Sequence, residues 1–155
     1  MTRRDFLLAG TAAALVSALP WRPLFAAEKS GLSVVLYKNP GCGCCEDYGS
    51  YLRQHGFKVT IKESDKVAAM SANAGVPADL QGCHTAFIDG YVVDGHVPIE
   101  AIRKLLAEHP SIKGLTVPGM PPGSPGMAGI KEEPLVVYAI DTTGTTGTKS
   151  IYMTM

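Results

Sequence analysis

The sequence is poor in charged and aromatic residues, and neither charge is in excess. Charged residues make up 18% and aromatic residues 7% of the 155 residues, and 14 Lys and Arg balance 14 Asp and Glu. Proteins that bind nucleic acids or anionic membrane surfaces normally carry a clustered basic excess, so neither partner is expected here. The length allows one globular domain, since a single core commonly uses roughly 100 to 200 residues.

Cysteine is also scarce. Four cysteines are too few for a disulfide-dense scaffold, and three of them, Cys42, Cys44 and Cys45, lie within four positions of one another. The fourth is Cys83. This spacing indicates that the cysteines serve chemistry more than they staple the fold.

No apolar run near the amino end is long enough to cross a membrane. The run from Phe6 to Leu19 has 14 residues, whereas a spanning helix needs roughly 20. Residues 1–27 combine Arg3 and Arg4, this apolar run and a small-residue end, which is the organisation of an export signal. The paired arginines predict the twin-arginine (Tat) route, and the lack of Cys in this signal peptide excludes a lipoprotein anchor. We therefore expect a periplasmic protein without stable membrane insertion, in which residues 28–155 form a single domain.

The rest of the chain predicts alternating strands and helices. Short apolar and β-branched runs predict strands, and apolar residues at helical spacing predict helices. The predicted elements are strands over 32–38 and 57–62, helices over 44–55 and 65–74, a hairpin over 86–93 around Asp89-Gly90, and a helix from Pro98 to about His109. This βαβαββα order is that of the thioredoxin fold, so we expect a thioredoxin-like α/β protein with helices covering a central mixed sheet.

A Gly-, Pro- and Met-rich segment follows the last predicted helix. Residues 113–134 contain too many Gly and Pro for a helix or a strand, and Leu135 to Ile140 and Ser150 to Thr154 predict a C-terminal β-hairpin. Long loops inside compact domains are usually lids, binding loops or linkers. Because this loop is tethered at both ends, we expect it to be able to cover a site.

The predicted fold puts the first cysteine cluster at the amino end of the first helix. Backbone amides and the helix dipole stabilise a thiolate there and lower its pKa. In thioredoxins a Pro-Thr pair opens the strand that faces this position, and here His84-Thr85 opens the corresponding strand. Cys83 is therefore expected beside the first cluster, so that all four cysteines converge.

Two chemistries fit this cluster. Cys42 and Cys45 have the Cys-x-x-Cys spacing of a dithiol/disulfide site, for which the third sulfur, Cys44, is surplus. Zinc sites with four thiolates usually use two separate Cys-x-x-Cys pairs, whereas closely spaced sulfurs suit bridging between several Cu(I) ions. Metal would also protect the thiols in an oxidising compartment.

Four further side chains are candidate copper ligands. Imidazole binds copper in both oxidation states, and thioether sulfur is a good ligand for Cu(I). His84 adjoins Cys83, His96 follows the hairpin, and Met120 and Met127 lie in the loop. Three of them also have a structural alternative, since His96 could cap the third helix and the methionines could fill gaps beneath the loop.

Five segments carry a family resemblance. They are Tyr37–Cys45 (YKNPGCGCC), Gly75–Pro77, Cys83–Thr85, Gly90–Pro98 (GYVVDGHVP) and Val117–Met127 (VPGMPPGSPGM). In combination they resemble the CopG-like copper-resistance family, over nearly the whole chain from Leu32. The resemblance implies a periplasmic thioredoxin-like protein whose four cysteines hold a copper cluster. It assigns Cys42, Cys44 and Cys45 to a CxCC motif, Cys83 and His84 to a Cys-His pair, and His96, Met120 and Met127 to further motif positions.

The sequence thus predicts an exported copper-binding protein for copper resistance, with a thiolate-bridged Cu(I) cluster. Electrons or copper could pass from this cluster to another periplasmic copper protein or an exporter. The alternative is a thiol-disulfide oxidoreductase using Cys42 and Cys45, although the absence of a proline before Thr85 counts against a substrate groove of the thioredoxin type. A metallochaperone would present an exposed apolar patch near the loop. No hydrolase or transferase motif is present, so copper redox activity is the enzymatic activity left open.

Overall fold

The computed structural model describes residues 31–142 and 150–155. The predicted export signal and residues 143–149 of the predicted terminal hairpin lie outside these ranges. Within them, no helix is both long and apolar enough to cross a membrane.

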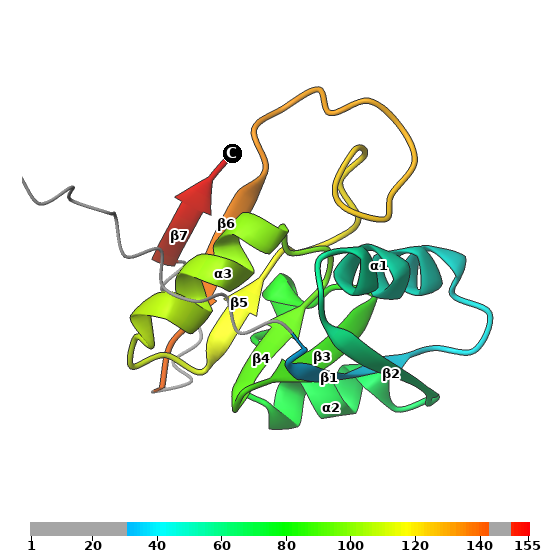
Figure 1. Cartoon of the computed structure of the whole chain (residues 1–155), viewed down its shortest axis with the longest axis horizontal. Helices are drawn as coiled ribbons and strands as arrows, with labels where there is room; N and C mark the ends of the chain where they lie inside the picture. Colours follow the sequence, from blue (N-terminus) through cyan, green and yellow to red (C-terminus); the bar gives the residue numbers. More distant parts are fainter. Residues whose placement is uncertain (1–30, 143–149) are drawn as a thin grey trace, which may run out of the picture.

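The elements are β1 (Ser33–Lys38), α1 (Gly43–Gln54), β2 (Lys58–Glu63), α2 (Val67–Asn73), the 3-10 helix η1 (Ala78–Leu80), β3 (His84–Ile88), β4 (Tyr91–Asp94), α3 (Ile99–Glu108), β5 (Gly114–Thr116), β6 (Val136–Ile140) and β7 (Ser150–Thr154) (Figure 1).

The described strands form one mixed sheet in the order β2-β1-β3-β4-β5-β6-β7. Strand β1 pairs in parallel with β2, and β4 with β5, whereas the remaining neighbours are antiparallel. In Figure 1, α1 and α3 lie on one face of the sheet and α2 lies on the other. The predicted α/β class is confirmed, and the βαβαββα order through α3 is compatible with a thioredoxin-like fold.

The main core lies between the sheet and helices α1 and α3. Tyr48 and Leu52 of α1 and Ile102 and Leu105 of α3 are fully buried. Their spacing of three or four residues gives each helix one apolar face, as the sequence predicted. Helix α1 is therefore packed against the sheet through this face.

The hairpin between β3 and β4 turns at the predicted pair of residues. Asp89 has a φ of 49° and Gly90 a φ of 84°, which are the positive angles that a two-residue turn requires. Pro98 directly precedes α3 in an extended conformation and is not its first helical residue, and the first amide of α3, that of Ile99, donates a 2.8 Å hydrogen bond to the hydroxyl of Tyr51. His96 is therefore not the cap of this helix.

The segment predicted as a loop over 113–134 begins with a strand, β5, so that part of the prediction was wrong. A Cβ atom at Gly114 would lie 1.7 Å from the carbonyl oxygen of Val92, and glycine is therefore needed for this close pairing. Three residues that begin with glycine give no apolar alternation, which is why the sequence pattern missed the strand. The predicted C-terminal hairpin is present as β6 and β7, paired antiparallel.

Candidate metal centre

A strand, a tight turn and a helix bring three cysteines to one place. The turn after β1 includes Gly41, whose φ is +75°, and the amide of Cys42 donates a hydrogen bond to the carbonyl of Asn39. Cys42 is the residue that precedes α1, and Cys44 and Cys45 lie in its first turn. The cysteines thus lie at the amino end of the first helix, as the sequence predicted.

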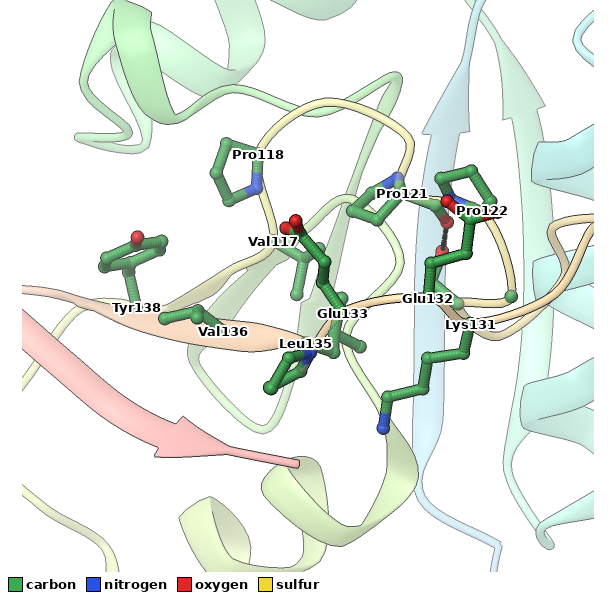
Figure 2. Close-up of a pocket in the computed structure, with 13 residues that line it drawn as sticks. Val117, Pro118, Pro121, Pro122, Lys131, Glu132, Glu133, Leu135, Val136 and Tyr138 are labelled. Carbon is green, nitrogen blue, oxygen red and sulfur yellow. Dashed lines mark hydrogen bonds between the residues drawn. The ribbon is translucent and has the colours of Figure 1, made fainter.

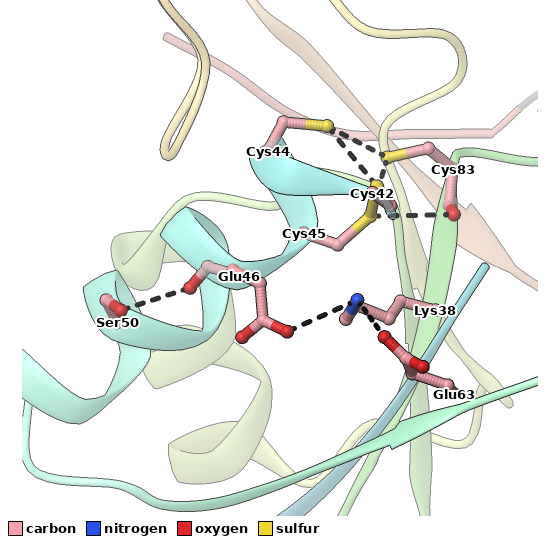
Figure 3. A network of polar contacts seen from close by, with 8 residues as sticks. All are labelled: Lys38, Cys42, Cys44, Cys45, Glu46, Ser50, Glu63 and Cys83. Atoms are coloured by element: carbon pink, nitrogen blue, oxygen red, sulfur yellow. Dashed lines mark hydrogen bonds and ion pairs between the residues drawn. A yellow bond between two sulfur atoms is a disulfide. The ribbon is translucent and has the colours of Figure 1, made fainter. Parts of the chain in front are cut away.

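Cys83, which directly precedes β3, meets this cluster beside the end of β1. Its Sγ lies 3.7 Å from Cys45 Sγ and 3.9 Å from Cys44 Sγ (Figure 3). Cys44 Sγ in turn lies 3.5 Å from Cys42 Sγ. All four sulfurs lie within 4.8 Å of one another. The sulfurs converge as the predicted fold required, although 38 residues separate Cys45 from Cys83.

The four sulfurs are not chemically equivalent. Cys42 and Cys45 are joined by a disulfide, and Cys44 and Cys83 are thiols. The Cys-x-x-Cys pair therefore has the oxidised form of a dithiol site. In this state two sulfurs of the cluster retain the ability to bind a metal as thiolates.

Two buried imidazoles adjoin Cys83. His84 opens β3 and His96 follows β4, and both side chains are fully buried. Cys83 Sγ lies 3.4 Å from His84 Nδ1 and 3.2 Å from His96 Nε2. These three residues form a second group of potential ligands that shares Cys83 with the first.

A backbone carbonyl fixes the orientation of His96. Its Nδ1 lies 2.7 Å from the carbonyl oxygen of Pro125. A carbonyl oxygen only accepts hydrogen bonds, so Nδ1 carries the proton and Nε2 turns its lone pair toward Cys83. Metal-binding histidines commonly have this support on the far nitrogen. No pattern in the sequence predicts this contact, because 29 residues separate the two partners.

Burial keeps the donors of this second group neutral near pH 7. The pKa of His84 is lowered to about 3, by burial and then by the neighbouring His96. Burial likewise lowers the pKa of His96. The pKa of the Cys83 thiol is raised to about 12, first by burial and then by Cys44. His84 Nε2 is buried and has no hydrogen-bond partner among the described residues. A buried thiol and two buried imidazoles, all neutral near pH 7, are donors that suit a soft or borderline metal ion.

The aromatic ring of Tyr48 packs against both imidazoles. Its centroid lies 4.6 Å from that of His84 and 5.4 Å from that of His96. The hydroxyl donates a 2.8 Å hydrogen bond to the carbonyl of Val97. The helical spacing over 44–55 predicts a buried position for Tyr48 but not its contact with the histidines.

Two glycines allow the backbone segments that carry Cys83 and His96 to touch. A Cβ atom at Gly82 would lie 2.5 Å from the Cα of Gly95. Gly95 has a φ of +70°, and a Cβ atom there would lie 2.3 Å from the carbonyl oxygen of Val117. Each glycine directly precedes a candidate ligand, and this pattern is the signal from which the sequence could have predicted the close approach.

A buried carboxylate also anchors the Cys83 segment. Asp94, which is fully buried, accepts hydrogen bonds from the amide of Gly82 and the hydroxyl of Ser71. Burial raises its pKa, although these hydrogen bonds oppose the shift. The residue before Cys83 is thus held by a side chain from the neighbouring strand, a role that the sequence did not indicate.

An ion-pair network lies behind the turn that carries Cys42. Lys38 is buried at the end of β1, and its Nζ lies 2.9 Å from Glu63 of β2 and 3.2 Å from Glu46 of α1 (Figure 3). The hydrogen bond to Glu63 is the main cause that raises the pKa of Lys38. The network joins the three elements around the cysteine turn.

The predicted covering loop reaches the centre near Pro125. Besides the bond from His96 to Pro125, a Cβ atom at Gly126 would lie 2.6 Å from the backbone nitrogen of Tyr48. The loop therefore packs on the amino half of α1. Met120 is 53% exposed and Met127 is half-buried, and their role as ligands remains a prediction.

A pocket of about 350 Å³ lies between the loop and β6 (Figure 2). Its walls are mainly proline, valine and leucine, with three charged side chains from the loop. The lining residues are Val117, Pro118, Pro121, Pro122, Gly123, Ser124, Lys131, Glu132, Glu133, Pro134, Leu135, Val136 and Tyr138. None of them is a cysteine or a histidine, so this pocket is not part of the candidate metal centre.

The chain is similar to a known family and to two solved structures. A family model described as "Protein of unknown function, DUF411" matches residues 80–127. Two solved structures, "Copper resistance protein copG- Form 2" and "Copper resistance protein copG- Form 1", are each 36% identical, with TM-scores of 0.73 and 0.72. Each match covers 81% of this chain, and the two matches cover 99% and 98%, respectively, of the chains in the solved structures. No curated protein matches the chain. The identity and the coverage together show that the chain belongs to the family of the copper resistance protein CopG.

Proposed function

We propose that this protein is an exported, periplasmic copper-binding protein of copper resistance. It holds a thiolate-bridged Cu(I) cluster on Cys42, Cys44, Cys45 and Cys83. The observation that carries the proposal is the convergence of four sulfurs, within 4.8 Å of one another, at the amino end of α1. The names of the two solved relatives, both copper resistance proteins, support copper as the metal.

The separations between the sulfurs fit ions that are shared between thiolates. Two thiolates that bind one ion at roughly 2.3 Å lie at most about 4.6 Å apart. The distances from Cys44 Sγ to Cys42 Sγ and to Cys83 Sγ are 3.5 Å and 3.9 Å. Cys44 thus has a sulfur on each side, and a thiolate there could bridge ions bound by both neighbours. Soft thiolate ligands select Cu(I) over harder ions.

Loading the full cluster requires reduction of the disulfide. Breaking the bond between Cys42 and Cys45 takes two electrons and two protons and returns two thiols. Binding of Cu(I) then displaces the thiol protons, because the thiolate is the form that binds metal. The protein alone supplies no electrons for this step, so a reductant of the dithiol class must act first.

The remaining predicted ligands surround this sulfur cluster. His84 and His96 adjoin Cys83 and add imidazole donors to one side. Met120 and Met127, on the loop that packs on α1, are proposed as thioether ligands that meet copper as it enters. Export through the twin-arginine route, predicted by residues 1–27, would deliver the folded protein to the periplasm.

Anaerobic titration of the reduced chain with Cu(I) tests the proposal, with elemental analysis of the desalted product. The wild-type chain should retain several equivalents of copper. Cys44→Ser removes the sulfur between Cys42 and Cys83 and should lower the retained copper to one equivalent or less. Gln54→Ser, an exposed substitution at the far end of α1, should retain as much copper as the wild type. Equal copper in Cys44→Ser and in the wild type would contradict a bridged cluster.

The disulfide favours a second candidate function, that of a thiol-disulfide oxidoreductase. Cys42 and Cys45 are already paired, as the oxidised form of such an enzyme requires. This function uses only that pair, so Cys44→Ser should keep full activity in the reduction of a protein disulfide. Cys45→Ser should abolish the activity. A chain that exchanges disulfides but retains no copper would replace the first proposal with this one.

A further inference from the structure

We propose that the disulfide form of this chain carries a site for one borderline divalent cation, formed by Cys83, His84 and His96. The pairing of Cys42 with Cys45 removes two thiolates from the sulfur cluster but leaves these three donors untouched. The oxidation state of one disulfide would then decide whether the centre takes several Cu(I) ions or one divalent ion. The switch between several Cu(I) ions and one divalent ion rests on the proposed function. The divalent site itself does not.

The distances from Cys83 Sγ to the two imidazole nitrogens are close to those around a tetrahedral ion, and all three ligand atoms lie within 4.8 Å of one another. An ion at roughly 2.3 Å from sulfur and 2.0–2.1 Å from nitrogen separates the two ligand atoms by about 3.6 Å. Cys83 Sγ lies 3.4 Å from His84 Nδ1 and 3.2 Å from His96 Nε2. The donors need to separate by only a few tenths of an ångström to admit an ion.

The protonation state of His96 suits metal binding before any ion arrives. The carbonyl of Pro125 holds the proton on Nδ1, so Nε2 offers its lone pair toward Cys83. In metal centres a backbone carbonyl in this position orients the ligand and raises its basicity. His84 adds a second, fully buried imidazole, whose Nδ1 lies 3.4 Å from Cys83 Sγ.

The donor types select the class of ion. One thiolate and two imidazoles form a harder set than four thiolates, and such sets suit Zn²⁺, Co²⁺ and Cu²⁺. Three protein ligands also leave a coordination position for water or a further donor.

The two forms interconvert by an ordinary thiol-disulfide exchange. An external dithiol attacks the bond between Cys42 and Cys45, transfers two electrons and two protons to these sulfurs, and leaves as a disulfide. The reverse reaction uses an external disulfide. Cys83, His84 and His96 take no part in this exchange, so they are available to metal in both forms.

Titration of the oxidised full chain with Co²⁺ tests the site, with the absorption of the cobalt-thiolate bond as the readout. The wild type should bind one equivalent, and Zn²⁺ and Cu²⁺ should displace it in separate competition arms that rank the two ions. His96→Gln should weaken Co²⁺ binding at least about tenfold. His55→Gln, which alters the histidine at the end of α1, should bind as the wild type does.

Alkylation of the oxidised wild-type chain tests the site without a substitution. Cys44 and Cys83 are its two thiols. One equivalent of Zn²⁺ should slow the labelling of Cys83 at least about tenfold and should change that of Cys44 less than twofold. The inference is overturned if the oxidised chain binds no Co²⁺, if His96→Gln binds it as tightly as the wild type, or if Zn²⁺ leaves Cys83 unprotected. A parallel Cu(I) titration of the reduced chain reports on the proposed function alone.

Discussion

Three of the candidate ligands lie at the amino end of α1, whereas three others reach the centre from the ends of two strands. Cys42, Cys44 and Cys45 come from four consecutive positions, and their arrangement is set by the start of the helix. Cys83, His84 and His96 depend on contacts between distant segments, including the bond from His96 to Pro125. The first group can change its chemistry by forming a disulfide, and the second is held by buried neighbours. A centre built in this way can alter its donor set without a change of fold.

The largest effect is expected from the one residue that both groups share. Cys83→Ser removes the sulfur that lies 3.7 Å from Cys45 Sγ and 3.2 Å from His96 Nε2. We expect the affinity for Cu(I) in the reduced chain and for Co²⁺ in the oxidised chain to fall roughly 100-fold or more, because even indirect supporting residues cost 10- to 100-fold. Competition titrations with a chelator measure both affinities. If either affinity is unchanged, Cys83 does not join the two groups.

The contacts between strand ends predict a cost for a side chain at Gly95. Gly95→Ala should lower the free energy of unfolding by about 2 to 3 kcal/mol, because the methyl group would meet the carbonyl of Val117 in addition to the unfavourable φ of +70°. Gly56→Ala is the matched control, since Gly56 has a φ of +92° and nothing within 4 Å of a Cβ atom. The control should lose only about 1 kcal/mol. Urea denaturation of both variants measures the difference, and equal losses would show that the close approach costs nothing.

The buried thiol of Cys83 predicts that divalent metal binding depends on pH. The pKa of Cys83 is about 12, so at neutral pH binding must displace its proton. The pKa of His84 is about 3, so His84 is already neutral and releases none. The affinity of the oxidised chain for Zn²⁺ should therefore rise about tenfold from pH 7 to pH 8, with one proton released per ion. Calorimetry in two buffers of different ionisation enthalpy counts the protons, and the absence of proton release would contradict this assignment.

The smallest effect is expected from the hydroxyl of Tyr48. Tyr48→Phe keeps the ring against both histidines but removes the hydrogen bond to Val97. The free energy of unfolding should fall by about 1 kcal/mol, with metal affinities unchanged in both oxidation states. Thermal denaturation and the Co²⁺ titration together check this pair of expectations. A large loss of Co²⁺ affinity would instead mean that the hydroxyl helps to position the imidazoles.

Local patterns predicted most of the fold. The strands and helices through α3 follow from apolar periodicity and from the Asp89-Gly90 turn, which act over a few neighbouring residues. Strand β5 was missed because three residues beginning with Gly114 carry no periodic signal. Its place in the sheet depends on pairing with β4 and β6, which are distant in sequence.

Two parts of the site could be predicted from the sequence: the residues that form a short motif, and the residue that the thioredoxin-like order of elements brings beside that motif. The CxCC motif is visible in the sequence, and the expected thioredoxin-like order brought Cys83 beside it. The support from Pro125, Tyr48 and Asp94 was not predictable, because each is a tertiary contact between residues that share no motif. The disulfide was left open by the spacing, since Cys-x-x-Cys suits both a redox pair and a metal ligand pair.

The metal content of the chain, purified under reducing conditions from copper-supplied cells, tests the central claim most directly. The claim is that sulfurs from α1 and from the start of β3 together hold copper. Elemental analysis should find several equivalents of copper per chain in the wild type and at most a trace in Cys83→Ser. A single equivalent of zinc, no bound metal, or equal copper in the wild type and in Cys83→Ser would contradict the claim.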